Sequence, residues 1–252
     1  MASVSKPVAS MVTYRLTFSK SGPTRWLGHL DIMRTFERAF RRCAVPVALS
    51  QGFNPRPKFR FVIPSAVGVA ARADVVFVDI EQRSDNCPEV ASWDPGIPIE
   101  CLNATLPEGL RIYSAERVAD AERRAALHAY RFAVYRMEFE STQQTAGAQL
   151  DLVIARLRQQ PSAIAVDPVR GESREVPLDR YLVEMLAEAT GDGTFAVWFT
   201  TTFGQDGTLR PMDVAALIAE RLPGSELVNL ERLALSTNPP DKSCTGQEKD
   251  AK

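Results

Sequence analysis

Between residues 29 and 43 the apolar side chains recur at spacings of three and four, and no glycine or proline interrupts the run. This pattern predicts a helix over 29–43 that begins directly after Gly28. When each residue turns the helix by about 100°, one sector holds Ile32, Met33, Phe36, Phe40 and Cys43. The opposed sector holds Arg34, Arg38, Arg41 and Arg42. We therefore expect a helix that buries one side and presents guanidinium groups on the other.

The same kind of pattern predicts further elements before and after this helix. In the first half, strands are expected over 14–20, 45–49, 58–63, 75–80 and 110–118, and a short helix over 98–106. In the second half, strands are expected over 130–139, 163–167, 181–189, 195–202 and 227–235. Helices are expected over 146–160 and over 211–222, where Pro211 suits the first turn. The second half therefore repeats the plan of the first.

Two short segments support this repetition. LPEGLRIYSAERV at 106–118 and LPGSELVNLERL at 222–233 share a Leu-Pro pair, a glycine turn, a strand and a Glu-Arg pair, and each half opens a strand on Tyr-Arg. The match is short, so coincidence remains an alternative. Repetition at about half the chain length favours an α+β fold of two tandem ferredoxin-like (βαββαβ) modules with mainly antiparallel sheets. We expect a flexible leader over 1–11, a basic module over 12–120, a second module over 128–236 and a disordered tail over 237–252.

Charge is divided unevenly along the chain, although the net charge is only −1. Residues 1–72 carry 12 of the 30 basic groups and 2 of the 31 acidic groups, which leaves 18 basic and 29 acidic groups for residues 73–252. Such a basic segment indicates an anionic partner, most often a nucleic acid. Two alternatives stay open, an ordinary solvated helix face or attraction between the basic and acidic parts of the chain. Within the helix, only Glu37 is expected to pair with the arginines.

A loop rich in proline follows the helix: Ser50-Gln51-Gly52-Phe53-Asn54-Pro55-Arg56-Pro57-Lys58. Gly52 can take positive φ, and a residue before proline is biased toward an extended or turn conformation. Because two prolines fix the backbone around Arg56, the loop can hold Arg56, Lys58 and the amides of Gln51 and Asn54 in place at a low entropic cost. The alternative is a rigid turn between two strands.

Three motifs in this region resemble a known family: Trp26-Leu27-Gly28-His29-Leu30-Asp31, Phe36-Glu37-Arg38-Ala39-Phe40-Arg41-Arg42 and Ser50-Gln51-Gly52-Phe53-Asn54-Pro55. They are similar to the signature of the radical SAM-linked protein family, a domain of unknown function that occurs alone or at the carboxy-terminal end of larger radical SAM proteins. The resemblance is densest over residues 13–79. It implies a radical SAM enzyme as partner and, more loosely, a link to RNA metabolism. Where the family pattern reads Asn-Pro-His-Pro-Lys, this chain has Arg56, which argues against a proton-transfer or metal site in the loop and leaves anion binding intact.

Cysteine and histidine do not form a metal-binding pattern in this sequence. The four cysteines contain no C-x-x-C pair and the chain has only two histidines, so we expect neither a metal site nor a cofactor. The three-cysteine motif of a radical SAM enzyme is missing, so the resemblance implies a companion of such an enzyme and not the catalyst itself. The absence of a long apolar run and of a signal-peptide pattern predicts no membrane span and a cytoplasmic location.

Three functions are compatible with these features. In the first, the chain binds RNA and delivers it to a separate modifying enzyme, with Phe53 or Trp26 stacking on an exposed base. The polar contacts of that site would come from Arg34, Arg38, Arg41, Arg42, Gln51, Asn54, Arg56, Lys58 and Arg60. In the second, the chain is an RNA-acting enzyme that uses His29 and Asp31 as an acid–base pair, although a histidine at a helix start is more often a capping or packing residue. In the third, the basic face docks an acidic protein. The sequence favours the first function without independent catalysis, and it leaves the oligomeric state open.

Overall fold

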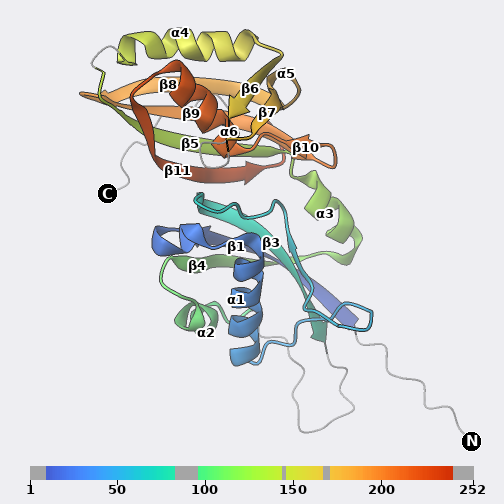
Figure 1. Ribbon diagram of the computed structural model, residues 1–252. Helices are drawn as coiled ribbons and strands as arrows, with labels where there is room; N and C mark the ends of the chain where they lie inside the picture. Colours follow the sequence, from blue (N-terminus) through green and yellow to red (C-terminus); the bar gives the residue numbers. More distant parts are fainter. Residues whose placement is uncertain (1–9, 83–95, 144–145, 167–170, 241–252) are drawn as a thin grey trace, which may run out of the picture. The chain divides into compact units, whose positions relative to one another are not determined.

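The computed structural model describes residues 10–82, 96–143, 146–166 and 171–240. The chain divides into two compact units, Met1–Ala129 and Tyr130–Lys252 (Figure 1). Each unit combines antiparallel strands with helices, so the α+β class expected from the sequence is confirmed. Within the described ranges, no helix is both long and apolar enough to cross a membrane.

The first unit is built on a sheet of antiparallel strands. Its elements are β1 (Ser10–Lys20), η1 (Gly22–Trp26), α1 (His29–Arg42), β2 (Phe59–Phe61), β3 (Ala70–Gln82), α2 (Ile99–Thr105), β4 (Leu110–Val118), η2 (Asp120–Glu122) and α3 (Arg123–Ala129), where η marks a 3-10 helix. Strand β1 pairs with β3 and β4, and β2 pairs with β3. The resulting order β4-β1-β3-β2, on a βαββαβ chain path, is the expected ferredoxin-like arrangement.

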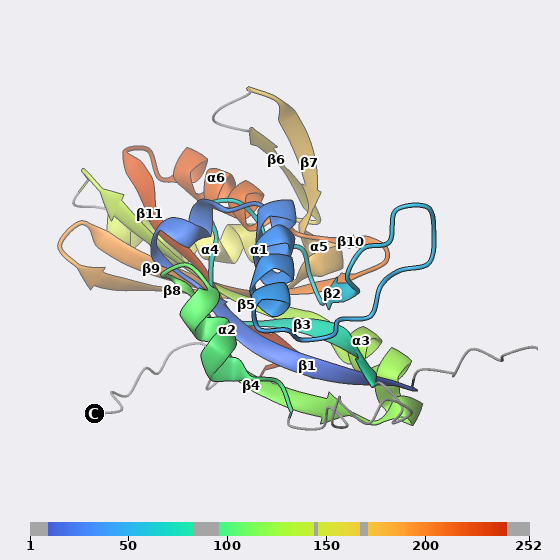
Figure 2. The ribbon, with the colours of Figure 1, turned by 90° about the horizontal axis from the view of Figure 1, so that it is seen from below.

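The core of this unit lies between the sheet and the helices α1 and α2, which cover the same face of the strands (Figures 1 and 2). Alternate residues of β1, from Val12 to Phe18, point into this core, as the period of a strand requires. The ring of Phe18 packs edge-on against that of Phe36 in α1, with centroids 5.1 Å apart. Burial of each such ring contributes roughly 1.5–3 kcal/mol. These contacts fix which side of α1 is turned outward.

The second unit repeats this topology with insertions. Its elements are β5 (Phe132–Ser141), α4 (Ala146–Gln159), β6 (Ser162–Val166), β7 (Ser173–Pro177), α5 (Leu178–Tyr181), β8 (Leu182–Gly191), β9 (Thr194–Gly204), β10 (Gly207–Thr208), α6 (Pro211–Arg221) and β11 (Ser225–Ser236). Strand β5 pairs with β11 and β9, and β8 pairs with β9, all antiparallel. The order β11-β5-β9-β8 is again ferredoxin-like. The β6–β7 hairpin and α5 form an insertion that the sequence pattern did not predict as such.

Each predicted helix agrees with an observed helix to within one residue at either end. The predicted strand over 45–49 is wrong, because this segment makes only isolated bridges, Val47 to Ile80 and Leu49 to Pro57. Proline provides the physical reason, since Pro46 and Pro57 have no N–H group to donate to a continuous ladder.

The ends of the chain and the acidic segment are described only in part. Strand β1 begins at Ser10, which places residues 10 and 11 of the expected leader in the sheet. Residues 83–95, which make up nearly all of the acidic and proline-rich segment 82–95, lie outside the described residues. The same holds for residues 1–9 and for residues 241–252 of the expected tail.

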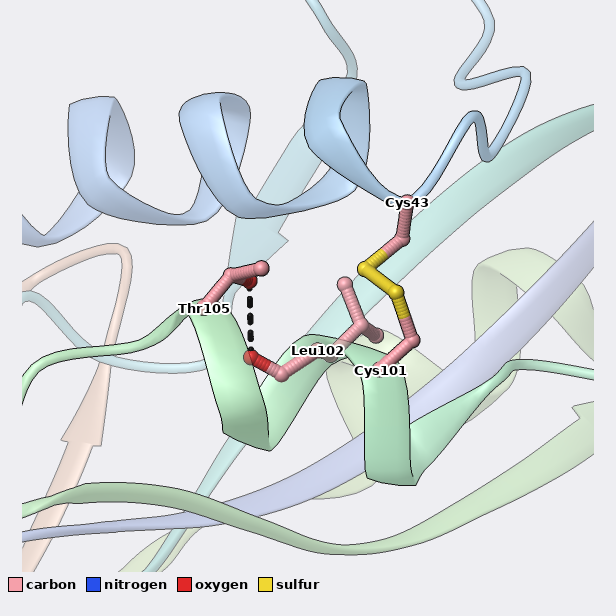
Figure 3. Close-up of a disulfide and its surroundings, with 4 residues drawn as sticks. All are labelled: Cys43, Cys101, Leu102 and Thr105. Atoms are coloured by element: carbon pink, nitrogen blue, oxygen red, sulfur yellow. Dashed lines mark hydrogen bonds between the residues drawn. A yellow bond between two sulfur atoms is a disulfide. The ribbon is translucent and has the colours of Figure 1, made fainter.

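A disulfide between Cys43 and Cys101 crosslinks α1 to α2 (Figure 3). Cys43 is the residue that directly follows α1, Cys101 lies in α2, and their Cα atoms are 6.0 Å apart. The two cysteines are 58 residues apart in the chain, and no spacing motif connects them, so their pairing could not be predicted from the sequence. The bond ties the end of the arginine helix to its neighbouring helix.

Candidate nucleic-acid interface

The four arginines of α1 lie on its outward face, opposite the buried residues Ile32, Phe36 and Phe40. All four are exposed, as the helical period predicts. Arg34 forms a loose ion pair of 3.8 Å with Asp31, and Arg38 donates a hydrogen bond of 3.3 Å to the hydroxyl of Thr35. The expectation that Glu37 would be the only partner within the helix was therefore wrong, because Asp31 lies three residues before Arg34 and shares its side of the helix.

Arg41 and Arg42 have no carboxylate partner among the described residues. Both lie in the last turn of α1, where a positive charge next to the free carbonyl groups stabilises a helix by typically 0.3–1 kcal/mol. This interaction with the helix end explains why basic residues occur there. It does not occupy the guanidinium N–H groups of Arg41 and Arg42 that point to solvent. The face therefore keeps its capacity to bind an anion.

The loop over 50–58 is closed at its base by hydrogen bonds. The backbone N–H of Ser50 donates to the carbonyl of Arg56 at 2.8 Å, and the N–H of Arg56 donates to the Ser50 hydroxyl at 3.0 Å. The N–H of Lys58 donates to the carbonyl of Ala48 at 2.9 Å. Beyond this base, residues 51–56 are all exposed, and Gly52 takes the positive φ, 143°, that the sequence suggested. The loop thus presents Gln51, Phe53, Asn54 and Arg56 to solvent, while Lys58 is half-buried.

Arg60 does not belong with these exposed cations. Its guanidinium donates two hydrogen bonds, of 2.8 and 2.7 Å, to the carboxylate of Asp79, which is fully buried. The hydroxyl of Thr13 donates to the same carboxylate at 2.7 Å, and Arg123 of α3 also pairs with it. The expected phosphate contact by Arg60 must therefore be revised, because its donors already serve a buried acid within the first unit.

The pKa of Asp79 reflects these contacts. Burial raises the pKa, since it disfavours the charged carboxylate. The hydrogen bonds from Arg60 and Thr13, together with the positive charges of Arg60 and Arg123, outweigh burial and hold the pKa of Asp79 below its ordinary value. Asp79 is therefore ionised near neutral pH, and its carboxylate binds Arg60, Arg123 and Thr13 in one network within the first unit.

His29 and Asp31, the candidate acid–base pair, point to different surroundings. The ring of His29 is half-buried and packs edge-on against Phe61, with centroids 4.9 Å apart. Burial lowers the pKa of His29, and its Nδ1 atom is buried without a hydrogen-bond partner in the described structure. Asp31 is exposed and lies against Arg34. Among the described residues, no hydrogen bond joins His29 to Asp31, so the pair lacks the contact that general acid–base catalysis usually uses.

Three exposed apolar residues lie near the start of α1, and the sequence identifies only one of them as a candidate site residue. Trp26, Leu30 and Val67 are 60%, 57% and 57% exposed, which is unusual for three large apolar residues of one region. The sequence indicates Trp26 as a candidate for base stacking, but it carries no signal for Val67. Val67 lies in the connection between β2 and β3, 41 residues after Trp26, and no sequence pattern relates it to α1. Within the described ranges, no cluster of histidine, cysteine and acidic residues can hold a metal ion.

Comparison with known proteins gives a family but no activity. Residues 13–211 match the model of a family described as "Uncharacterized protein conserved in bacteria" (DUF2344). No curated protein matches the chain. Among solved structures, a chain from the "Crystal Structure of a Cbf5-Nop10-Gar1 Complex" is 8% identical with a TM-score of 0.48, covering 88% of this chain and 48% of that one. An unknown protein from Galdieria sulphuraria is 15% identical with a TM-score of 0.23, covering 89% of this chain and 100% of its own. This chain spans about half the length of the first of these neighbours, and at these values neither likeness assigns a function.

Proposed function

The chain belongs to this uncharacterised bacterial family, and from that premise we propose that it is an RNA-binding accessory protein that presents RNA to a separate modifying enzyme. The resemblance of its motifs to the radical SAM-linked family makes a radical SAM enzyme the first partner to test. In this proposal the chain needs no cofactor and has no independent catalytic activity.

The observation that carries the proposal is the exposed arginine face of α1. Four guanidinium groups lie on one helix side, and two of them, Arg41 and Arg42, have no carboxylate partner among the described residues. Arginine suits phosphate because its planar donors can form two parallel hydrogen bonds to the phosphate oxygens. The loop adds Arg56, half-buried Lys58 and the amides of Gln51 and Asn54 to the same unit. The first unit therefore offers several groups that can bind phosphate.

The helix side of the first unit suits this role better than the opposite face of its sheet. Ferredoxin-like RNA-binding modules of the RRM type stack bases on aromatic residues of their sheet. The two middle strands of this sheet are β1 and β3. Thr13 of β1 and Phe77 of β3 point away from the helices, and both are completely buried. The exposed aromatic residue Tyr113 lies on the neighbouring strand β4, and its hydroxyl donates to Ser19. This arrangement favours RNA binding through α1 and the loop over 50–58 rather than on the opposite face of the sheet.

The other two functions have weaker support. An RNA-acting enzyme would need His29 as acid or base, and its half-buried ring against Phe61 is accounted for by packing. Docking of an acidic protein uses the same arginines, and the exposed Trp26, Leu30 and Val67 are the observation in its favour. The binding experiment below separates these functions.

A cytoplasmic location forms part of the proposal, because bacterial RNA and its modifying enzymes are found there. The Cys43–Cys101 disulfide is the observation against it, since disulfides are rare in reducing compartments. Alkylation of free thiols in intact cells, followed by mass spectrometry of the isolated chain, measures which form is present. A predominantly oxidised pair would argue for an oxidising compartment.

RNA binding can be tested with fluorescently labelled RNA and a matched pair of variants. The double change Arg38→Glu and Arg41→Glu should abolish binding, and the affinity of the unchanged protein should fall steeply as salt rises. The control is Arg156→Glu with Arg158→Glu, which makes the same charge change at two exposed arginines of the last turn of α4. Equal loss of binding in both double variants would indicate a general charge effect and contradict a site on α1. Binding of a protein partner, but of no RNA, in nuclease-treated extract would favour docking.

A further inference from the structure

The outward face of α1 is apolar at its start and basic toward its end. Trp26 is the last residue of η1, three positions before α1 begins, and Leu30 lies in the first turn of α1; both are more than half exposed. Arg34, Arg38 and Arg41 follow Leu30 at spacings of four, four and three residues, which places them along one stripe of the helix. From Leu30 to Arg41 this stripe extends for about 16 Å at 1.5 Å per residue. An apolar surface and a line of cations therefore adjoin each other.

The backbone beneath Trp26 is held by a buried lysine. Lys20 is 1% exposed, and its ammonium group donates to the carbonyl of Ala66 at 2.7 Å and to the carbonyl of Arg25 at 3.4 Å. The N–H of Gly68 donates to the same Arg25 carbonyl at 2.8 Å. These bonds join η1 to the connection between β2 and β3. The position of Trp26 is thus set by the folded structure before any ligand arrives, which lowers the cost of binding.

Gly68 allows the connecting segment to approach the Trp26 ring. A Cβ atom at Gly68 would lie 3.1 Å from Cζ3 of the indole, and the φ of Gly68, +79°, is one that other residues rarely adopt. On the indole, the guanidinium carbon of Arg25 lies 5.0 Å from the ring centroid, which is a cation–π distance. Trp26 nevertheless remains 60% exposed. The indole and the guanidinium together offer flat surfaces to a flat ligand.

We infer that this site takes a single-stranded stretch of RNA, with an unpaired base stacked on Trp26 and Arg25 and the following phosphates bound by the α1 arginines. The inference rests on the proposed function and specifies its ligand. A base in a paired A-form helix is stacked within the duplex, whereas an unpaired base can be splayed out onto aromatic rings and guanidinium planes. Because a paired base within a duplex leaves no free ring face for Trp26, the exposure and the support of this indole favour an unpaired strand.

The test measures binding of a 12-nucleotide unstructured RNA and of a fully paired duplex of the same length. The background protein carries Trp93→Phe and Trp198→Phe, so that Trp26 is its only tryptophan. Stacking should quench the fluorescence of Trp26 when the single strand is added. Trp26→Ala, made in the unchanged protein, should weaken single-strand binding by roughly 5- to 150-fold, the range for loss of one stacked base, and should leave duplex binding within about twofold. Trp26→Phe should recover part of the loss, and circular dichroism should show that both variants are folded.

The outcomes distinguish this inference from the function on which it rests. If Trp26→Ala binds the single strand as well as the unchanged protein does, while Arg38→Glu with Arg41→Glu abolishes binding, the stacking site is contradicted and the RNA-binding function remains. Equal affinity of the unchanged protein for duplex and single strand also contradicts the inference. If neither RNA binds, both proposals fail. In that case, loss of a nuclease-resistant protein complex in Trp26→Ala would assign the apolar group to protein docking.

Discussion

Arg60 donates two hydrogen bonds to the buried carboxylate of Asp79, at 2.8 and 2.7 Å, although it belongs to the same basic segment as the exposed arginines of α1. The sequence shows a run of cations, and the structure divides it into two groups with different roles. Arg34, Arg38, Arg41 and Arg42 face solvent, whereas Arg60, together with Arg123 from outside that segment, neutralises an acid that the sheet removes from water. We propose that the first group binds the ligand, whereas Arg60 forms part of an ion network within the first unit.

Asp79→Asn should therefore destabilise the first unit strongly. The change removes the negative charge that Arg60 and Arg123 share, and the loss of one partner from a buried ion pair typically costs about 3–5 kcal/mol. The measurement is the free energy of unfolding in urea. Asp31→Asn is the matched control, because it makes the same substitution in an exposed pair with Arg34 at 3.8 Å, for which a cost of about 0–1 kcal/mol is expected. Similar costs for the two variants would show that the Asp79 network is not structural.

Stability should also decrease as the pH falls below about 6.5, through His29. Burial lowers the pKa of His29 in the folded state, so the unfolded chain binds its proton at a higher pH than the folded chain does. The contribution is fully present above the unfolded pKa of about 6.5 and is lost as the pH falls through the folded pKa. His29→Phe keeps a ring against Phe61 and should flatten the curve of unfolding free energy between pH 7 and pH 5. An unchanged slope would assign the pH dependence to another group.

Asp79 gives a separate signal at lower pH. Because its folded pKa lies below the ordinary value, its contribution is present above about pH 4 and is lost as the pH falls through the folded pKa. The His29 and Asp79 effects therefore occur in different pH windows, and each is removed by its own substitution.

Reduction of the Cys43–Cys101 disulfide should lower the stability of the first unit by roughly 2–4 kcal/mol, because the open chain regains the freedom that a crosslink across 58 residues removes. The unfolding midpoint should fall when dithiothreitol is added and should not respond to it in Cys43→Ser or Cys101→Ser. Both single variants should resemble the reduced protein. A midpoint that is insensitive to reductant in the unchanged protein would show that the crosslink does not form in solution.

Local pattern was sufficient for α1, α2, α4 and α6 and for the repeated topology, but not for the short helices α3 and α5. Phe36 and Phe40 follow the period of α1, and the alternation from Val12 to Phe18 follows that of β1, because each element must place its apolar side against one core. Proline limited the prediction over 45–49, where hydrophobic residues suggest a strand but Pro46 and Pro57 provide no ladder donors.

The sequence by itself determined which residues lie inside and outside the predicted helices and the main strands, and with them a basic helix face in a doubled ferredoxin-like chain. Only the tertiary structure decided which cations face solvent and which pair with a buried acid, because Arg60 meets Asp79 through the pairing of β2 with β3 and Arg123 reaches the same carboxylate from α3. It also brought Gly68 to Trp26 and Cys43 to Cys101. Periodicity depends on neighbours three or four residues away, whereas these contacts join residues 19 to 58 positions apart and exist only after the sheet has formed.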